Sequence, residues 1–382
     1  MRQWLAGAAL LAAGLALGQP TQPRWALQYF YDRDGKDLRI TDLAFPSATR
    51  GIAVGAIVDR EGRRPQFTAL VTSDGGEHWS LVPLKELPRS LFFLDESNGW
   101  LVTNEGLWFT SEAGRSWMRI GDQIKPNKKL ADAPRGGLIL RVWFLDARHG
   151  YAVGLQKSVF ETRDGGHTWT RLEEAAKPAA NPAFTTYSHI AFADSRRGMI
   201  LGASAPLGFD VGTSDDLPER ALARRQQSRL AIELDTRDGG ATWKSGTAAL
   251  LGSLNRLRLA GTSGLAVFSY ADSFEWPAEV YRIDLETGKS ESVFRQKDRR
   301  VTDAAIFPDG RAFIAAVEPP GRLRSAPIPG KVRMLESGDL KNWKEMEVDY
   351  RAVAQSLVLA GPDASHMWAA TDTGMILHLA LP

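Results

Sequence analysis

The sequence predicts an all-β protein built as a seven-bladed β-propeller. Three observations lead to this prediction: a repeated turn, a repeated set of short strands before it, and a last unit that lacks one strand. The turn reads TSDGGEHW from Thr72, TRDGGHTW from Thr162 and TRDGGATW from Thr236. A degenerate copy, TSEAGRSW, begins at Thr110, and the end of a fifth copy is found at Trp343. Repeats at this spacing are typical of propellers and other repeat folds.

Each turn follows the same arrangement of apolar and polar segments. The stretches FLDESNGWLV from Phe93 and FLDARHGYAV from Phe144 both place a polar turn between two apolar strands. A third strand then runs into the repeated turn, and its Trp begins a fourth strand. Four short strands joined by tight turns are the unit of a propeller blade.

Counting these units along the chain gives seven blades in one domain, 19–382. The predicted blades lie near 38–84, 90–120, 138–172, 187–246, 254–295, 300–348 and 352–381. The last of these holds only three strands. The segment 24–30, RWALQYF, begins with the Trp expected of a fourth strand. We therefore expect the N-terminal strand to complete the last blade, which closes the ring and covers both free edges.

The repeated turn has a structural explanation. Its Asp and Thr side chains can accept hydrogen bonds from backbone N–H groups a few residues away, its Gly can adopt a positive φ, and its Trp can bury a large ring against the neighbouring hairpin. The residues to which this structural role is assigned are Thr72, Asp74, Gly76, Trp79, Thr110, Glu112, Gly114, Trp117, Thr162, Asp164, Gly166, Trp169, Thr236, Asp238, Gly240, Trp243 and Trp343.

These residues resemble the Asp-box, the S/T-x-D-x-G-x-T-W turn of BNR-repeat propellers. The copies at Thr162 and Thr236 match every defined position, whereas His78 replaces Thr in the first copy and Glu112 replaces Asp in the second. The resemblance implies that the boxes lie on the face away from the usual binding site, and that they are specific for architecture rather than for function.

The FLD-turn-G-aromatic units followed by an Asp-box also resemble the photosystem II stability/assembly factor family. This resemblance implies an exported, non-catalytic scaffold that binds a partner protein, with membrane-associated proteins among the candidates. A sialidase-like glycosidase is the alternative, although the chain contains no Arg-Ile-Pro motif. Carbohydrate binding without hydrolysis, through aromatic residues such as Trp276 or Phe184, is a third possibility.

Composition restricts the chemistry. The chain of 382 residues has no Cys, which excludes disulfides and zinc–cysteine sites, and its net charge of +2 gives no signal for nucleic acid. The six His show no paired metal spacing, so neither a metal nor another cofactor is expected. Residues 1–18 read as a signal peptide cleaved between Gly18 and Gln19, which predicts a periplasmic or secreted protein. We expect a monomer.

The long connections predict where a partner binds. Segments 121–137, 205–228 and 318–331 fall on one face if the strand count holds, and long loops on a rigid scaffold often carry function. Within 205–228, SDDLPERALARRQQ predicts a helix capped by Asp216. The candidate partner-binding residues are the basic ones near this face, namely Lys128, Lys129, Arg135, Arg299, Arg300, Arg322 and Arg324.

Overall fold

The structure is a computed structural model that describes residues 22–33, 35–59, 65–122, 124–129, 137–204, 229–270, 275–318 and 329–382. The predicted signal peptide, the predicted helix within 205–228, and Arg135, Arg322 and Arg324 lie outside the described residues.

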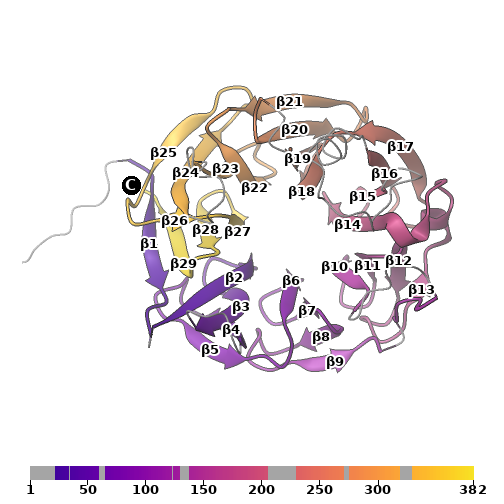
Figure 1. Ribbon diagram of the computed structural model, residues 1–382, viewed down its shortest axis with the longest axis horizontal. Helices are drawn as coiled ribbons and strands as arrows, with labels where there is room; N and C mark the ends of the chain where they lie inside the picture. Colours follow the sequence, from indigo (N-terminus) through magenta and orange to yellow (C-terminus); the bar gives the residue numbers. More distant parts are fainter. Residues whose placement is uncertain are drawn as a thin grey trace, which may run out of the picture.

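The prediction of an all-β propeller is confirmed. Figure 1 shows sheets arranged in a ring, with one strand of each unit nearest the centre. Five of the sheets are separate and four-stranded. In chain order they are β2 (Lys36–Ala44), β3 (Gly51–Asp59), β4 (Gln66–Thr72) and β5 (Ser80–Pro83); β6 (Pro88–Phe93), β7 (Gly99–Thr103), β8 (Leu107–Thr110) and β9 (Met118–Ile120); β10 (Ile139–Phe144), β11 (Gly150–Gly154), β12 (Ser158–Thr162) and β13 (Thr170–Arg171); β14 (Thr185–Phe192), β15 (Gly198–Ser204), β16 (Arg229–Thr236) and β17 (Lys244–Leu250); and β18 (Ser253–Ala260), β19 (Ser263–Ser269), β20 (Ala278–Asp284) and β21 (Ser290–Arg295).

The remaining strands form one nine-stranded sheet, so the expectation of seven separate blades is wrong. These strands are β1 (Arg24–Phe30), β22 (Arg300–Ile306), β23 (Ala312–Val317), β24 (Gly330–Ser337), β25 (Lys344–Val348), β26 (Val353–Ala354), β27 (Leu357–Asp363), β28 (His366–Thr371) and β29 (Met375–Ala380). The merger has one cause. β1 pairs antiparallel with β29 over most of its length and also pairs parallel with the end of β25, which joins two four-stranded groups.

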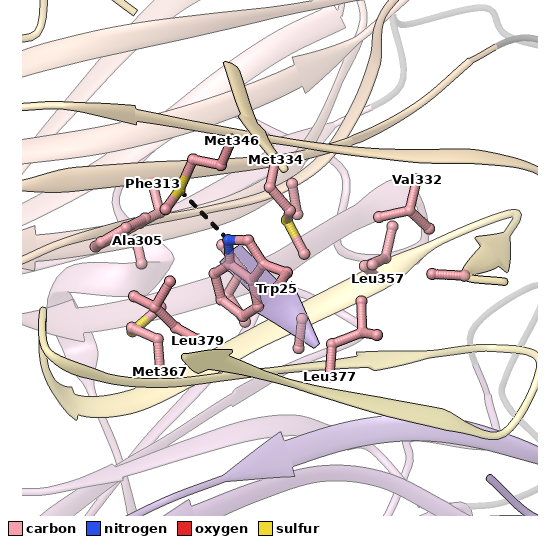
Figure 2. Packing of buried hydrophobic residues seen from close by; sticks show 14 of the residues in the cluster. Trp25, Ala305, Phe313, Val332, Met334, Met346, Leu357, Met367, Leu377 and Leu379 are labelled. Atoms are coloured by element: carbon pink, nitrogen blue, oxygen red, sulfur yellow. Dashed lines mark hydrogen bonds between the residues drawn. The ribbon is translucent and has the colours of Figure 1, made fainter. Parts of the chain in front are cut away.

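Trp25 fixes β1 in place. Its side chain is 0% exposed and packs edge-on against Phe313, with ring centroids 6.4 Å apart. Its indole N–H points to the sulfur of Met346 at 3.4 Å, and Figure 2 shows the ring enclosed by side chains from β22–β25 and β27–β29. The N-terminal strand therefore contributes the largest side chain of a core formed otherwise by the C-terminal third of the chain.

The Asp-box turns are held by their own side chains. In the box that begins at Thr162, the hydroxyl donates to Asp164 at 2.8 Å and accepts the Gly166 N–H at 2.9 Å. Asp164 in turn accepts the Thr168 N–H at 2.8 Å and its hydroxyl at 2.6 Å. The box at Thr236 repeats this arrangement.

The other boxes vary the same arrangement. Thr72 and Asp74 make the same bonds, with His78 in place of the final Thr. Thr110 accepts the Gly114 N–H, but the Glu112 carboxylate accepts the hydroxyl of Ser116 and does not take the place of the Asp. A turn beginning at Ser337 uses Asp339 and Asn342. Gly76, Gly114, Gly166 and Gly240 all have positive φ.

The boxes also join each sheet to the one before it. The carbonyl of Gly165 accepts the indole N–H of Trp100 at 3.0 Å, and that of Gly75 accepts the indole N–H of Trp368 at 3.1 Å. At Gly240 the contact is so close that an added Cβ would lie 1.8 Å from the Tyr151 hydroxyl. The boxes therefore connect neighbouring sheets as well as closing their own hairpins.

The Trp of each box packs edge-on against a Phe at the boundary between two sheets. Trp79 meets Phe45 at 5.9 Å between centroids, and Trp243 meets Phe192 at 6.0 Å. The corresponding pairs are Trp117 with Phe93, Trp169 with Phe144, and Trp343 with Phe294. Aromatic wedges of this kind add burial and specific geometry at the boundaries between sheets.

We predict that Trp25→Ala destabilises the protein by about 3–5 kcal/mol, because it removes a fully buried aromatic ring from the core that holds β1. Trp25→Phe should lower the free energy of unfolding much less, since an aromatic ring remains in the site. Urea unfolding followed by circular dichroism measures both changes. Equal stability of Trp25→Ala and the parent protein would show that β1 does not hold the ring closed.

Stability should fall in acid through the box carboxylates. Hydrogen bonds from Thr168 hold the pKa of Asp164 at about 2, and bonds from Thr242 hold that of Asp238 at about 2, both below the ordinary 3.8. Because these folded-state pKa values are depressed, the stabilisation is present above about pH 4 and is lost as pH falls toward 2.

The measurement is urea unfolding between pH 7 and pH 2. A double variant with Asp164→Asn and Asp238→Asn should lose less stability over this window than the parent. Asp298→Asn serves as the control, because that carboxylate pairs with Arg299 and caps no turn. Identical pH slopes for the double variant and the parent would contradict the assignment.

Candidate functional site

The innermost strands share a distortion at one height in the ring. In β2, β6, β10, β14, β18 and β22 the pairing register with the next strand shifts once, at one residue within the strand. The residue after each shift is Asp42, Ser90, Arg141, His189, Arg256 or Asp303, and all six are polar. A β-bulge redirects side chains locally, and here it brings six polar groups to the central channel.

Several of these groups link neighbouring innermost strands. Asp42 accepts the Leu91 N–H at 2.8 Å, Ser90 donates to the Leu140 carbonyl at 2.8 Å, and Asp303 accepts the Leu359 N–H at 2.9 Å. Because backbone groups exposed by the bulges are satisfied from the adjacent sheet, the channel wall is held by side chains rather than by sheet pairing.

Asp303 is the anchor of this wall. It is 0% exposed and lies 3.2 Å from Arg256 Nε and 3.6 Å from an Arg258 terminal nitrogen. It also accepts the N–H of Ala304 at 2.8 Å. Nearby carboxylates, with Asp303 foremost, raise the pKa of Arg256 despite the opposing effect of its burial. The buried charges here are paired and hydrogen-bonded, as a stable interior requires.

His189 is neutral and points along the wall. Its Nε2 donates to the Asn255 carbonyl at 2.8 Å, which leaves Nδ1 to accept the Ser188 hydroxyl at 2.8 Å. Burial lowers the pKa of His189 well below its usual value, and the nearby charge of Arg141 lowers it further. His189 therefore positions its neighbours and carries no charge at neutral pH.

Arg141 differs from Asp42, Arg256, Arg300 and Asp303, which all have partners in the wall. Arg89 shares with Arg141 the lack of a bonded partner among the described residues. Although Arg141 is mostly buried, no hydrogen bond or ion pair joins its guanidinium to another described residue. Burial, followed by repulsion from Arg256, lowers its pKa to about 10, so it stays charged at neutral pH. Asp42 and Asp303 oppose this lowering by electrostatic attraction, but neither bonds the guanidinium. A mostly buried cation without a directly bonded partner among the described residues favours an anion from outside the chain.

Arg141 lies in a funnel of about 1010 Å³ at the mouth of the channel. The innermost strands and the links that precede them line it. Its charged lining consists of Arg89, Arg141, Arg256 and Arg300, with Asp42 as the one carboxylate among the described lining residues. Since Asp42 is already bonded to backbone N–H groups of Leu43 and Leu91, the free charge of the funnel is positive. The site can hold a carboxylate or another anion.

The Asp-boxes lie on the opposite face. On the funnel face an innermost strand begins beside the end of the next strand, as Thr185 of β14 pairs with Ser204 of β15. On the other face the innermost strand ends, as where Phe144 of β10 pairs with Gly150 of β11, and Gly150 pairs in turn with Thr162, which opens a box. The funnel is therefore on the face opposite the boxes, where β15 ends and β16 begins, and its described lining includes no box residue.

The predicted basic residues take different positions. Arg300 lines the funnel and donates to the Gln355 carbonyl at 2.5 Å. Arg299 does not line the funnel and pairs with Asp298 at 2.7 Å and Glu345 at 3.4 Å, so its role in partner binding stays a prediction. Lys128 and Lys129 are exposed on the connection after β9 and do not line the funnel.

Sequence reasoning missed Arg89, Arg141 and Arg256. A signal for one of them, Arg141, exists in the repeats. Each of the motifs TDLAF, RSLFF, LRVWF and SHIAF has a polar residue three positions before its last Phe. A polar residue repeated at the same place in successive innermost strands indicates a common position around the channel.

Other candidate chemistry is weak in the described part of the chain. Asp74, Glu77 and His78 place possible metal ligands within 4.8 Å of one another, but all three are exposed and Asp74 already bonds His78. Trp276 stacks under Arg295, 4.3 Å from its ring centroid, and Phe184 ends a short 3-10 turn, Pro182–Phe184. Within the described residues, no helix has the length and apolarity needed to cross a membrane.

Comparisons with known proteins agree with this architecture. The family described as photosynthesis system II assembly factor YCF48 matches residues 125–207, and no curated protein matches the chain. YCF48 bound to D1 peptide has a TM-score of 0.55 at 15% identity, covering 92% of this chain and 99% of that one. YCF48 from Cyanidioschyzon merolae has a TM-score of 0.56 at 13% identity, covering 93% and 98%. An ancestral GH74 enzyme has a TM-score of 0.54 at 12% identity, covering 92% and 46%. At these identities the structural similarities establish the fold alone.

We predict that Asp303→Ala destabilises the protein by about 3–5 kcal/mol, because it leaves the buried Arg256 guanidinium and two backbone N–H groups without their acceptor. Asp309→Ala, which removes an exposed partner of Arg311, should change stability by less than about 1 kcal/mol. Chemical denaturation of both variants makes the comparison. Equal effects of the two substitutions would show that the channel wall does not depend on Asp303.

Proposed function

We propose that this chain, an Asp-box β-propeller that resembles the YCF48 assembly factors, is a non-catalytic scaffold that binds an acidic segment of a partner protein at its channel mouth. Arg141 carries the proposal, because its guanidinium is mostly buried and charged and has no partner in the described chain. A carboxylate entering the funnel would supply the missing counter-charge and could bond the guanidinium through two parallel N–H donors.

The shape of the site suits an extended segment better than a flat protein surface. A funnel of about 1010 Å³ can admit a few residues of a chain, and its wall offers arginines from several sheets. Because cross-sheet hydrogen bonds already hold that wall, a ligand meets arginines fixed in advance and little ordering cost is added. YCF48 bound to D1 peptide is one propeller of similar fold that holds a peptide.

The funnel offers little for glycoside hydrolysis, although GH74 enzymes share the fold. Glycosidases use two carboxyl groups, one to protonate the leaving group and one to act as nucleophile or base. Asp42 is the one carboxylate among the described lining residues, and both of its oxygens accept backbone N–H bonds. This observation favours binding over catalysis. Release of product from a glycoside by the purified protein would overturn the proposal.

We extend the proposal to the molecule as a whole. Two four-stranded groups of the nine-stranded sheet, β22–β25 and β27–β29 with β1, would each act as one blade, giving a ring of seven blade equivalents within 19–382. The Asp-boxes would serve the architecture alone. The signal-like sequence 1–18 supports a site of action outside the cytoplasm, where the acidic segment of a membrane-associated protein would be accessible. The protein would act there as a monomer.

The test is fluorescence anisotropy with labelled peptides of equal length, one ending in Asp-Glu residues with a free carboxylate and one with neutral residues and an amidated end. The acidic peptide should bind more tightly, and its affinity should fall as salt rises. Arg141→Gln should lower the affinity for the acidic peptide by about tenfold or more, because a charged hydrogen-bonded pair of this kind contributes about 1.5–3 kcal/mol.

Lys341→Gln is the matched control. It removes one positive charge from the turn that begins at Ser337, on the Asp-box face, and should leave the affinity unchanged. Thermal melting of both variants verifies that they fold. Equal affinity of Arg141→Gln and the parent for the acidic peptide would refute the funnel as the binding site.

A further inference from the structure

One boundary between sheets lacks the aromatic packing found at the others. Where β10–β13 meet β14–β17, the ring of Phe192 stacks on Tyr151 and meets Trp243 edge-on. Phe45 with Trp368 and Trp79, and Phe144 with Trp100 and Trp169, repeat this arrangement. Each boundary of this kind holds three rings: one from the preceding sheet, one at the end of the innermost strand, and one from the box.

At the boundary between β14–β17 and β18–β21 all three positions are non-aromatic. Met199 follows the Gly that begins β15, Leu259 lies three residues after Arg256, and Lys289 directly precedes β21, where a box would place its Trp. Five buried residues form the core of this boundary, and the largest are Met199, Leu257 and Ile283. The loss of the box in β18–β21 therefore removes side-chain volume as well as a turn.

A cleft lies beside the positions that carry rings elsewhere, since Met199 lines it, as do Gly288 and Ser290 on either side of Lys289. It has a volume of about 750 Å³, within the range of small-molecule pockets, and its walls come from the two sheets. Small residues such as Gly246, Ala248 and Ala266 form much of the lining, so an entering molecule meets apolar surface with room to spare. The cleft is separate from the channel mouth apart from Tyr270, which borders both.

The polar groups of the cleft are mainly acidic. Glu279 is buried and accepts the hydroxyls of Tyr270 and Tyr281, both at 2.9 Å, which fixes these two rings in the wall. Arg295 approaches Glu279 at 3.7 Å and is held over the ring of Trp276. On the opposite wall, Glu233 has no hydrogen bond or ion pair with any described residue. The unpaired charge of the cleft is therefore negative.

We infer that this cleft is a binding site for a small flat aromatic molecule that carries a protonated amine. The ring would take the place of the missing indole between the walls, and the amine would lie toward Glu233. An aromatic ring fits because three other boundaries are filled by rings, and a cation fits because no described residue pairs with the Glu233 carboxylate. The site is independent of the anion-binding funnel.

Isothermal titration calorimetry with tryptamine, indole and indole-3-acetate tests the inference. Tryptamine should bind best and indole-3-acetate worst, because all three share the ring and differ in charge. Glu233→Gln should lower the affinity for tryptamine by about threefold and leave the affinity for indole unchanged, as expected for the loss of an exposed ion pair. A crystal soaked with tryptamine should show the ring between Met199 and Tyr281.

Two variants that fill the cleft provide the second arm. Lys289→Trp restores the missing box Trp, and Ala248→Phe narrows the cleft from β17. Each variant should lower the affinity for tryptamine by about tenfold or more. The melting temperature of each should equal or exceed that of the parent protein. Lys341→Trp, which adds an indole to an exposed turn of the nine-stranded sheet, is the control and should bind as the parent does.

Three results would overturn the inference. The first is the absence of saturable tryptamine binding to the parent protein. The second is binding that survives in both filled variants, which would place the ligand elsewhere. The third is indole-3-acetate binding as tightly as tryptamine, which would remove the role of the negative charge.

Discussion

The pairing of β1 with β29 is the interaction on which the ring depends. The strands of β27–β29 form only three-quarters of a unit, and without β1 their outer edge would expose unpaired backbone groups to solvent. β1 also pairs with β25, so one strand from the start of the chain joins two groups from its end. Trp25 adds a buried ring to this backbone pairing, and the local and long-range interactions thereby favour the same closed arrangement.

Closure makes the boundaries between sheets equivalent in geometry and leaves side chains to distinguish them. Where Phe, Trp and a second aromatic residue meet, the boundary is filled and rigid. At the boundary marked by Met199, Leu259 and Lys289, the same backbone arrangement leaves a cleft. The ring tolerates this gap because the neighbouring sheets are held by their other boundaries and by the channel wall, so a site can form there without loss of the fold.

The funnel and the boundary cleft carry opposite charge. Bulges at one height of the innermost strands bring Arg141 and Arg256 to the channel, where Asp303 forms an ion pair with Arg256 and none with Arg141. The boundary cleft has the opposite character, because Glu233 lacks a partner among the described residues and Arg295 contacts Trp276 and Glu279. One scaffold therefore offers a positive site on its axis and a negative site at its side.

The sequence by itself determined the all-β propeller, the repeated turn with its Thr, Asp, Gly and Trp, and the pairing of the first strand with the last, because each of these follows from short-range patterns repeated along the chain. It did not determine that two strand groups merge into one sheet, since that depends on β1 reaching the end of β25 in space. Nor did it reveal the channel site: Arg299 and Arg300 are adjacent in sequence, yet one pairs with Glu345 and the other lines the funnel. Only the tertiary structure decided which cations converge, because residues such as Arg89 and Arg141 belong to different repeats and meet only when the ring closes.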